Sequence, residues 1–469
     1  MSSVYDIIIV GGGIVGLGVF RQLTLNGFQS ILLLEKSSQI LTGASSGNSG
    51  ILHTGFDAVP HTLESKLVKR GYHLYQSFRQ DVELPIKKIG AYLIAWKEDD
   101  LQILKEVKDT AHQNDVLDIE EISSTMLYER EPLLRHGALA ALHIPGESVV
   151  DPLTLPLILL MHGKIFGGHI QTNVEVINGE YDYKNQCWAL NDGQYRSRIV
   201  VNCAGLYGDI VEQIRIKQQK SSTNTFTIQP RMGQFSVYSP PPGTSPLKSI
   251  ILPIPTKFTK GVIVYPNLFN QIIVGPTAQT QFDRSQAPIK SDVTRMLHEK
   301  INELIPSCAN SNYTRIGSYT GIRPATEHSD YQIHAYNEIQ WICCGGIRST
   351  GLTSSLAIGE YIYELVNEMS RERKYQLHCA GYSAERYSRS LDQLKVMFIA
   401  TPQGLQPKLI MKDSTLTVSA GDIEFTDEIN ITNLKIECNG ELFDVSHSLL
   451  KLAWMTTNSS FITPHACSD

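Results

Sequence analysis

The sequence predicts an α/β fold in which an antiparallel sheet is inserted into a parallel-sheet domain. Residues 5–35 read as a buried strand, a glycine turn, a helix and a second strand that ends in an acidic residue, which is the order of a βαβ unit. The apolar runs 199–204 and 339–344 are typical of further buried strands of the same sheet. Between residues 225 and 333, short β-rich runs alternate with proline-containing turns, which indicates an antiparallel sheet.

The βαβ unit carries the glycine spacing of a Rossmann-type dinucleotide site. Gly11 allows the tight turn, Gly13 lets the backbone approach a pyrophosphate, and Gly16 lets the helix pack closely on the sheet. Glu35, 19 residues past Gly16, can accept hydrogen bonds from a ribose diol. A structural βαβ unit without a ligand is the alternative, but the flanking strand and helix favour a nucleotide. The unit leaves open whether that nucleotide is NAD or FAD.

The composition is typical of a soluble enzyme of two to three domains. Of the 469 residues 42% are hydrophobic, which suffices for a core, and the net charge of −6 without a long basic run makes nucleic acid an unexpected partner. The eight cysteines include no CxxC spacing, so no metal centre is expected. Four residues precede the first strand, and the apolar run 153–161 is too short to cross a bilayer. We therefore expect a cytoplasmic protein without a targeting or transmembrane segment, with peripheral membrane association left open.

The remaining elements follow from apolar spacing and from turn residues. Helices are expected at 63–82, 99–114, 152–166, 291–304 and 351–369, and strands at 91–96, 169–176, 199–204, 227–238, 261–265, 271–275 and 339–344. Short strands are expected between residues 408 and 443. The elements predict a nucleotide-binding domain from residues 1–80, 146–215 and 335–375, a substrate domain from 81–145 and 216–334, and a small β-rich C-terminal appendage at 376–469.

Three later segments resemble a known flavoprotein family. They are GASSGNSGILHTGFDA at 43–58, VVNCAGLYGD at 200–209 and WICCGGIRSTGLTSSLAIGEYI at 341–362. With the βαβ unit they make residues 4–369 similar to the family of D-amino acid oxidase, sarcosine oxidase, glycerol-3-phosphate dehydrogenases and oxidases, and L-2-hydroxyglutarate dehydrogenase. An ordinary NAD enzyme does not need these late segments, whereas an extended FAD must be held along its whole length. The resemblance therefore implies non-covalently bound FAD.

The resemblance also implies a set of cofactor-binding residues at strand ends and in loops. They are Gly11, Gly13, Ile14, Val15, Gly16, Glu35, Lys36, Ser45, Ser46, Asn48, Ser49, Val174, Ala204, Gly205, Gly346, Gly351, Leu352 and Thr353. The amides at 351–353 begin a helix, and we expect them to stabilise negative charge at flavin N1 and O2.

The segment NSGILHTG at 48–55 resembles the loop in which the glycerol-3-phosphate and 2-hydroxyglutarate branches place a histidine beside the flavin. An imidazole suits a base that takes a hydroxyl proton near neutral pH while hydride leaves the carbon for flavin N5. The resemblance implies that His53 is this base. A structural histidine, hydrogen-bonded inside the loop, is the alternative.

An anionic substrate group requires cationic side chains. The segment YTGIRPAT at 319–326 resembles the family's (G)xRP motif, whose arginine grips the anion, and a guanidinium can do so through two parallel hydrogen bonds. The resemblance implies that Arg323 binds the substrate and takes part in catalysis, with Lys257, Lys260 and Arg348 as further substrate-binding candidates. A surface salt bridge is the alternative role for Arg323, and which of the two lysines contacts substrate stays open.

Departures from each branch bear on the substrate. The L-2-hydroxyglutarate branch usually has QTGHNSG in the loop near the histidine and NAPSPAATSS in the late motif. This chain has GASSGNSG and GIRSTGLTSS at these places, which is nearer to the glycerol-3-phosphate branch. The segment RMGQF at 231–235, however, departs from the RGEY or RGDY form of both branches. The resemblance implies oxidation of an anionic secondary alcohol, first sn-glycerol 3-phosphate, then L-2-hydroxyglutarate or another 2-hydroxy acid, and third an amine. A non-catalytic, flavin-bound interaction protein is the alternative outside enzymes. The electron acceptor, which could be oxygen, a quinone or a carrier protein, stays open.

Overall fold

The computed structural model describes most of the chain up to residue 397 and several short strands beyond it. The described residues are 4–219, 225–241, 247–255, 261–310, 313–371, 377, 379–397, 399–401, 404–406, 408–411, 434–438, 441–443 and 462–464. Two predicted substrate-binding residues, Lys257 and Lys260, lie outside them, as does the segment 412–433 of the predicted strand region.

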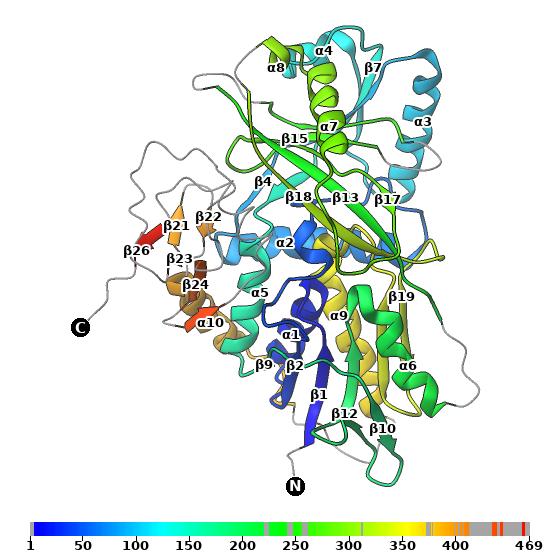
Figure 1. The fold of residues 1–469 in the computed structure, drawn as a ribbon, viewed down its shortest axis with the longest axis vertical. Helices are drawn as coiled ribbons and strands as arrows, with labels where there is room; N and C mark the ends of the chain where they lie inside the picture. The colour runs from blue at the N-terminus through cyan, green and yellow to red at the C-terminus, as the bar shows by residue number, and fades with distance from the viewer. Residues whose placement is uncertain are drawn as a thin grey trace.

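The first sheet contains the βαβ unit and lies in the lower half of Figure 1. Its strands are β1 (Val4–Val10), β2 (Ile31–Leu34), β9 (His169–Gln171), β10 (Gly179–Asp182), β11 (Cys187–Leu190), β12 (Tyr195–Asn202), β19 (Gln332–Tyr336) and β20 (Trp341–Gly345). The spatial order is β10-β11-β12-β1-β2-β9, with β20 also paired to β12 and β19 to β20. The pairs β1–β12, β1–β2, β2–β9 and β12–β20 are parallel, as a sheet built from βαβ units requires.

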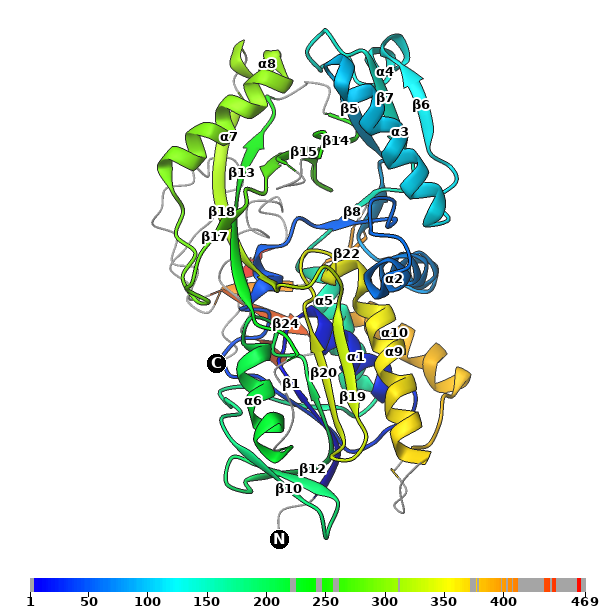
Figure 2. The same cartoon turned by 90° about the vertical axis from the view of Figure 1, so that its right-hand side faces the viewer.

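Helices cover both faces of the first sheet, which explains why its central strands are continuous apolar runs. In β1, Ile7 and Ile9 pack into the core with helices α1 (Ile14–Leu25), α2 (Leu63–Asp81), α5 (Thr154–Ile165) and α9 (Gly351–Arg371). Ile8 and Val10 point to the opposite face, which carries α6 (Gly208–Gln218). Figure 2 shows α1 and α9 on one side and α6 on the other. The carboxyl ends of the parallel strands are thereby left at one edge of the sheet.

The inserted sheet lies in the upper half of Figure 1 and is mainly antiparallel. Its strands are β5 (Ala91–Ala95), β6 (Glu120–Ser123), β7 (Ala140–Ile144), β13 (Gln229–Ser239), β14 (Ile250–Leu252), β15 (Ile263–Pro266), β16 (Ile272–Gly275), β17 (Gln279–Thr280) and β18 (Thr314–Ala325). Helices α3 (Glu98–Gln113), α4 (Ser124–Arg130), α7 (Ser291–Leu304) and α8 (Pro306–Asn310) accompany it. The spatial order is β17-β13-β16-β15-β14-β5-β7-β6, and β18 pairs with β13 along eleven residues. The long β13–β18 pair reaches down to the edge of the first sheet (Figure 1).

A small third sheet joins the two larger ones. It has the order β3 (Ile51–Leu52), β8 (Ser148–Val150), β4 (Ile86–Lys88), and both of its pairings are antiparallel. The strand β3 follows the short 3-10 helix η1 (Ala44–Gly47), and another such helix, η2 (Gly205–Tyr207), follows β12. Both short helices lie at the edge where the first sheet meets β18.

The tail begins with a helix that the sequence did not predict. Helix α10 (Ala384–Met397) packs against α5, and its Leu394 is fully buried in the core of the first sheet. The short strands that follow are β21 (Ile399–Thr401), β22 (Gly404–Gln406), β23 (Lys408–Met411), β24 (Leu434–Cys438), β25 (Glu441–Phe443) and β26 (Ile462–Pro464). The strands β23–β26 form one sheet, in the order β25-β24-β23-β26.

The architecture confirms the predicted α/β fold class with an inserted antiparallel sheet. The predicted domain boundaries stay a prediction, and β19 spans the one placed between residues 334 and 335. Over the part of the chain that the structure describes, no helix combines the length and apolar character needed to cross a membrane.

Candidate cofactor and active site

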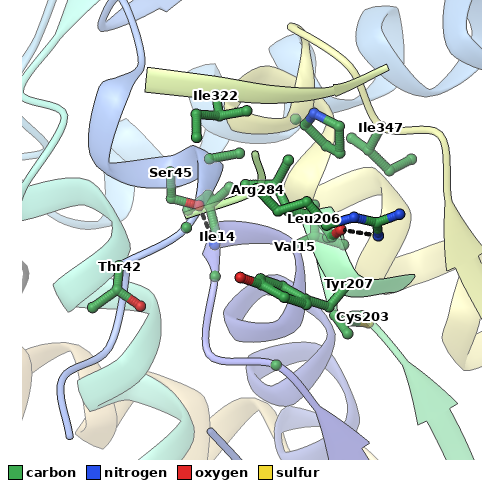
Figure 3. A pocket seen from close by; sticks show the side chains of 18 of the residues that line it. Ile14, Val15, Thr42, Ser45, Cys203, Leu206, Tyr207, Arg284, Ile322 and Ile347 are labelled. Carbon is green, nitrogen blue, oxygen red and sulfur yellow. Dashed lines mark hydrogen bonds between the residues drawn. The ribbon is translucent and has the colours of Figure 1, made fainter. Parts of the chain in front are cut away.

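A cavity of about 600 Å³ lies at the carboxyl edge of the first sheet, beneath β18 (Figure 3). Its lining comes from the loops after β1, β2, β9, β12 and β20 and from residues 320–322 of β18. The volume falls within the range of small-molecule and cofactor sites. Of the predicted cofactor-binding residues, those that line this cavity are Gly11, Gly13, Ile14, Val15, Glu35, Lys36, Ser45, Ser46, Asn48, Val174, Ala204, Gly205, Gly346, Gly351 and Leu352.

The three remaining candidates, Gly16, Ser49 and Thr353, are not lining residues of this cavity. A Cβ at Gly16 would collide with the carbonyl oxygen of Gly11, so this glycine serves the close packing of α1 on the turn. Thr353 Oγ1 accepts a hydrogen bond from the backbone N–H of His53 at 3.1 Å. The carbonyl oxygen of Ser49 accepts one from the Tyr265 hydroxyl at 2.6 Å. These contacts support the loops around the cavity, and the role of the three positions in cofactor binding stays a prediction.

The turn between β1 and α1 requires a residue without a side chain at Gly11. Gly11 has a φ of +112°, and a Cβ there would lie 2.5 Å from the carbonyl oxygen of Cys203. The N-cap residue Gly13 offers no side-chain cap to α1, and the Ile14 N–H donates to Ser45 Oγ at 2.9 Å (Figure 3). The bare N-terminus of α1 therefore faces the cavity with a hydroxyl beside it, which fits a pyrophosphate.

The acidic residue after β2 is held in place by backbone amides. Glu35 is buried, and its two carboxylate oxygens accept hydrogen bonds from the N–H groups of Gly12 at 2.7 Å and Ser37 at 2.9 Å. Each carboxylate oxygen can accept more than one hydrogen bond, so Glu35 can also accept from a ribose diol. Beside it, Lys36 Nζ lies 3.0 Å from the centre of the Tyr207 ring. This end of the cavity fits an adenosine group.

The first turn of α9 also contributes to the cavity lining. The lining residues Gly351 and Leu352 begin this 21-residue helix, whose N-terminus carries a partial positive charge. Arg348, a substrate-binding candidate, also borders the cavity, but its Nη2 donates to Glu64 Oε2 and to the Ser329 carbonyl, both at 2.6 Å. The guanidinium of Arg348 is thus neutralised by a carboxylate, and its role toward a substrate stays a prediction.

His53 forms a pair with a buried carboxylate that the sequence did not indicate. Its Nδ1 lies 2.8 Å from Glu147 Oε2, and the Glu147 side chain is 1% exposed. Glu147 Oε1 accepts hydrogen bonds from the N–H of Thr54 at 2.7 Å and from its hydroxyl at 3.0 Å. Glu147 stands 94 residues away from His53 in the sequence, in the turn before β8. Only the pairing of β3 with β8 could have revealed it.

Arg323 lies beside a second arginine on the neighbouring strand. Arg231 of β13 and Arg323 of β18 are direct partners in the antiparallel register, so their side chains leave the same face of the sheet. Burial, with a contribution from the charge of Arg231, lowers the pKa of Arg323 to about 10. The Nη2 of Arg323 donates a long hydrogen bond of 3.4 Å to the Thr277 carbonyl. Within the described part of the chain, no carboxylate pairs with either guanidinium. Two adjacent cations without a counter-ion suit an anionic ligand.

The loop that leads to His53 is packed on the strand that contains Arg323. A Cβ at Gly47 would collide with the backbone of Gly321, so η1 and β18 meet through two glycines. The hydroxyl of Tyr319, also in β18, donates to the Asn48 carbonyl at 3.3 Å. These contacts bring the two predicted catalytic segments to one region, at the border between the cavity and the inserted sheet.

The cavity is closed on one side by a clasp between the inserted sheet and α6. Arg284, from the loop before α7, donates hydrogen bonds to both carboxylate oxygens of Asp209, with Nη2 at 2.9 Å from Oδ2. It also donates to the Leu206 carbonyl at 2.7 Å (Figure 3). Both Arg284 and Leu206 line the cavity. No sequence pattern indicates this contact, because the two residues lie 75 positions apart.

Comparison with known proteins agrees with this geometry. Residues 6–365 match the family model described as FAD dependent oxidoreductase. The glycerol 3-phosphate oxidase of Mycoplasma pneumoniae is 30% identical over 373 residues, which cover 77% of this chain and 94% of that protein. The mitochondrial L-2-hydroxyglutarate dehydrogenase of Homo sapiens is 29% identical over 329 residues, which cover 67% of this chain and 69% of that protein.

A solved structure gives the same fold. The dithionite-reduced L-alpha-glycerophosphate oxidase from Mycoplasma pneumoniae, with FAD bound, superposes with a TM-score of 0.72 at 26% sequence identity. The superposition covers 81% of this chain and 97% of that one.

Proposed function

Because this chain belongs to the family of FAD-dependent oxidoreductases, we propose that it oxidises an anionic secondary alcohol to the ketone, with sn-glycerol 3-phosphate as the first substrate. FAD is its cofactor, as the sequence predicted. The residues present fit that cofactor, because the Gly11 turn, the bare start of α1 and the oriented Glu35 carboxylate offer the groups that a pyrophosphate and a ribose need. When bound, FAD supplies the acceptor of the hydride.

The observation that carries the choice of substrate is the arginine pair. Arg231 and Arg323 face the same side of the β13–β18 pair and have no counter-ion among the described residues. Two guanidinium groups can make parallel hydrogen bonds to several oxygens of one phosphate, which suits a doubly charged group better than a single carboxylate. Bringing such an anion between them also removes the repulsion between the two cations. We infer that this pair binds the phosphate.

We infer that His53 takes the proton from the substrate hydroxyl. A neutral imidazole can accept this proton as the C–H bond breaks with its electron pair and the carbon–oxygen double bond forms. His53 follows directly on β3, and its backbone N–H is bound to the Thr353 hydroxyl in the first turn of α9. The product of sn-glycerol 3-phosphate would then be dihydroxyacetone phosphate. Lys257 and Lys260 remain candidate ligands of the phosphate.

A second substrate is supported by one of the relatives. The human L-2-hydroxyglutarate dehydrogenase is almost as similar to this chain as the oxidase of Mycoplasma pneumoniae. A 2-hydroxy dicarboxylate would present a carboxylate to the same arginine pair and a hydroxyl to His53. The two substrates therefore differ in the anion, and binding of that anion discriminates between them.

The proposed function is tested by anaerobic titration of the FAD-loaded protein. Absorbance of the oxidised flavin is followed with sn-glycerol 3-phosphate, L-2-hydroxyglutarate, L-lactate and sarcosine. We expect sn-glycerol 3-phosphate to bleach the flavin fastest and at the lowest concentration. Bleaching by L-2-hydroxyglutarate alone would select the second substrate, and bleaching by none of the four would refute the proposal. Adding oxygen, a soluble quinone or a redox carrier protein to the reduced protein then identifies the electron acceptor.

A further inference from the structure

We propose that Glu147 is a positioning residue that holds the His53 ring with its proton on Nδ1, so that Nε2 carries the lone pair that takes the substrate proton. The inference rests on the proposed role of His53 as the base. It adds a residue that touches neither the substrate nor the cofactor and acts through His53 alone.

The hydrogen bonds of Glu147 determine which ring nitrogen of His53 carries the hydrogen. Its Oε1 accepts two hydrogen bonds, from the N–H and the hydroxyl of Thr54, and its Oε2 lies 2.8 Å from His53 Nδ1. An ionised carboxylate has acceptors only, so the hydrogen of the third contact must belong to Nδ1. In a neutral imidazole with its hydrogen on Nδ1, the lone pair is on Nε2. The contact thus selects one of the two tautomers.

The strand register places the two residues opposite each other. In the β3–β8 pair, Ile51 is opposite Val149 and Leu52 is opposite Ser148. The next positions in this antiparallel register are His53 and Glu147, so their side chains leave the same face. The meeting of imidazole and carboxylate is therefore built into the sheet and does not depend on a flexible loop.

The backbone of Glu147 is held from a second direction. Its carbonyl oxygen accepts hydrogen bonds from the N–H groups of Ile89 and Gly90, at 3.2 and 2.9 Å. The carbonyl of the preceding Gly146 accepts one from the hydroxyl of Tyr72, on α2, at 2.6 Å. On this fixed backbone, the carboxylate, whose side chain is 1% exposed, cannot turn away from His53 without losing its hydrogen bonds to the N–H and hydroxyl of Thr54. The ring orientation is fixed with it.

The carboxylate also stabilises the ring after proton transfer. The imidazolium of His53 would lie against the negative charge of Glu147 in a place with little water, where the attraction is stronger than in bulk solvent. Among the described residues, hydroxyls of Thr54, Thr353 and Tyr72 also lie beside the pair, and burial raises the pKa of Tyr72, which keeps it neutral. Glu147 places a negative charge directly against the His53 ring.

The test compares Glu147→Gln, Glu147→Asp and Thr54→Val in the FAD-loaded protein. The glutamine keeps the shape and the hydrogen bonds to Thr54, but its amide donates to Nδ1, which moves the ring hydrogen to Nε2 and removes the base. We expect anaerobic reduction of the flavin to slow on the order of 10²- to 10⁴-fold, the range that a positioned general base contributes. The dissociation constant of the substrate and the FAD content should stay as in the wild type, and the pH at which the rate rises should move down. Glu147→Asp should recover part of the rate.

The control separates positioning from simple support of the loop. Thr54→Val removes one hydrogen bond to Glu147 but leaves the carboxylate against His53, so its reduction rate should stay within a few-fold of the wild type. If Thr54→Val slowed reduction as much as Glu147→Gln, or if Glu147→Gln reduced at the wild-type rate, the inference would be overturned. His53→Asn tests the role of the base separately from the role of Glu147, because a wild-type rate in that variant would refute His53 as the base.

A measurement on the wild type keeps the inference testable if the glutamine variant does not fold. Nitrogen-15 NMR of histidine-labelled protein, assigned by comparison with His53→Asn, reports which ring nitrogen carries the hydrogen. We expect hydrogen on Nδ1 of neutral His53. A neutral ring with hydrogen on Nε2 would contradict the positioning role.

Discussion

Replacement of Arg323 by methionine should stabilise the protein while it weakens substrate binding. In the folded protein, burial and the neighbouring Arg231 lower the pKa of Arg323 from 12.5 to about 10. Because the folded state binds this proton less tightly than the unfolded chain does, the charge on Arg323 opposes folding by its full amount at every pH below about 10. That cost is lost only as the pH rises through about 10 toward 12.5, where the unfolded chain also releases the proton. Methionine has a similar reach and carries no charge.

The expected size of the effect follows from that pKa. At 1.36 kcal/mol per pKa unit, the lowering to about 10 corresponds to roughly 3 kcal/mol of unfolding free energy at neutral pH, which Arg323→Met should regain as an upper bound. The same change removes hydrogen bonds from a charged donor to the substrate anion, each worth about 1.5 to 3 kcal/mol. That loss should raise the dissociation constant by about 10- to 150-fold.

Two assays measure the two sides of this exchange. Urea denaturation without substrate gives the change in unfolding free energy, and anaerobic titration of the flavin spectrum gives the dissociation constant. Arg295→Met is the matched control, because Arg295 is an exposed arginine on α7, near the same sheet. An Arg323→Met variant that is less stable than the wild type, or that binds sn-glycerol 3-phosphate with unchanged affinity, would refute this reasoning. In that case the charge on Arg323 would not both destabilise the free protein and bind the substrate anion.

Further predictions concern the cofactor and the tail. Gly11→Ala places a Cβ 2.5 Å from the Cys203 carbonyl at a φ of +112°, so it should destabilise the fold by about 1–3 kcal/mol and lower the FAD content measured by absorbance. Gly43→Ala, whose Cβ would meet no protein atom within 4 Å, should leave the unfolding free energy of the FAD-free protein unchanged. Arg284→Ala opens the clasp to Asp209 and should speed FAD loss, seen as rising fluorescence of released flavin after dilution; an unchanged release rate would show that the clasp does not retain FAD. Leu394→Ala should cost about 2–5 kcal/mol in urea denaturation, because Leu394 is fully buried, and a cost near zero would mean that α10 does not pack on α5 in solution.

The parts of the fold that local patterns determine were predictable. Helix α7 has the predicted bounds, since its apolar residues recur at helical spacing, and α2 and α9 begin where expected. The strand expected at 169–176 ends at Gln171 instead, because the chain turns at Asn173, whose φ is +59°. A positive φ at one asparagine leaves no periodic trace in the sequence.

Elements that depend on distant contacts were not predictable. Helix α10 lies in a polar stretch of the sequence. One of its faces packs on the rest of the protein through distant contacts, such as the hydrogen bond from His162 to Ser390, 228 residues away. The strand β18 contains Gly317, Gly321 and Pro324, which read as turn signals, but it is paired along its length with β13.

The same limit applies to the site. Sequence spacing located Gly11, Gly13 and Glu35, and the family resemblance supplied most of the other residues that line the cavity. The cofactor and the family resemblance were confirmed. Glu147, Arg231 and Arg284 were missed because each meets its partner through strand register or through loop packing across 75 residues or more. The catalytic and substrate-binding roles of His53 and Arg323 stay predictions.

The most direct test of the central claim is a stopped-flow comparison of sn-glycerol 3-phosphate with glycerol under anaerobic conditions. Both molecules carry the same secondary alcohol, but only the first carries the anion that the arginine pair is proposed to bind. We expect sn-glycerol 3-phosphate to reduce the flavin at least about 100-fold more efficiently, the equivalent of about 3 kcal/mol of charge-assisted binding, and the Arg231→Met/Arg323→Met double variant to lose most of this preference. Equal reduction by glycerol, or a preference that survives the double variant, would contradict the claim.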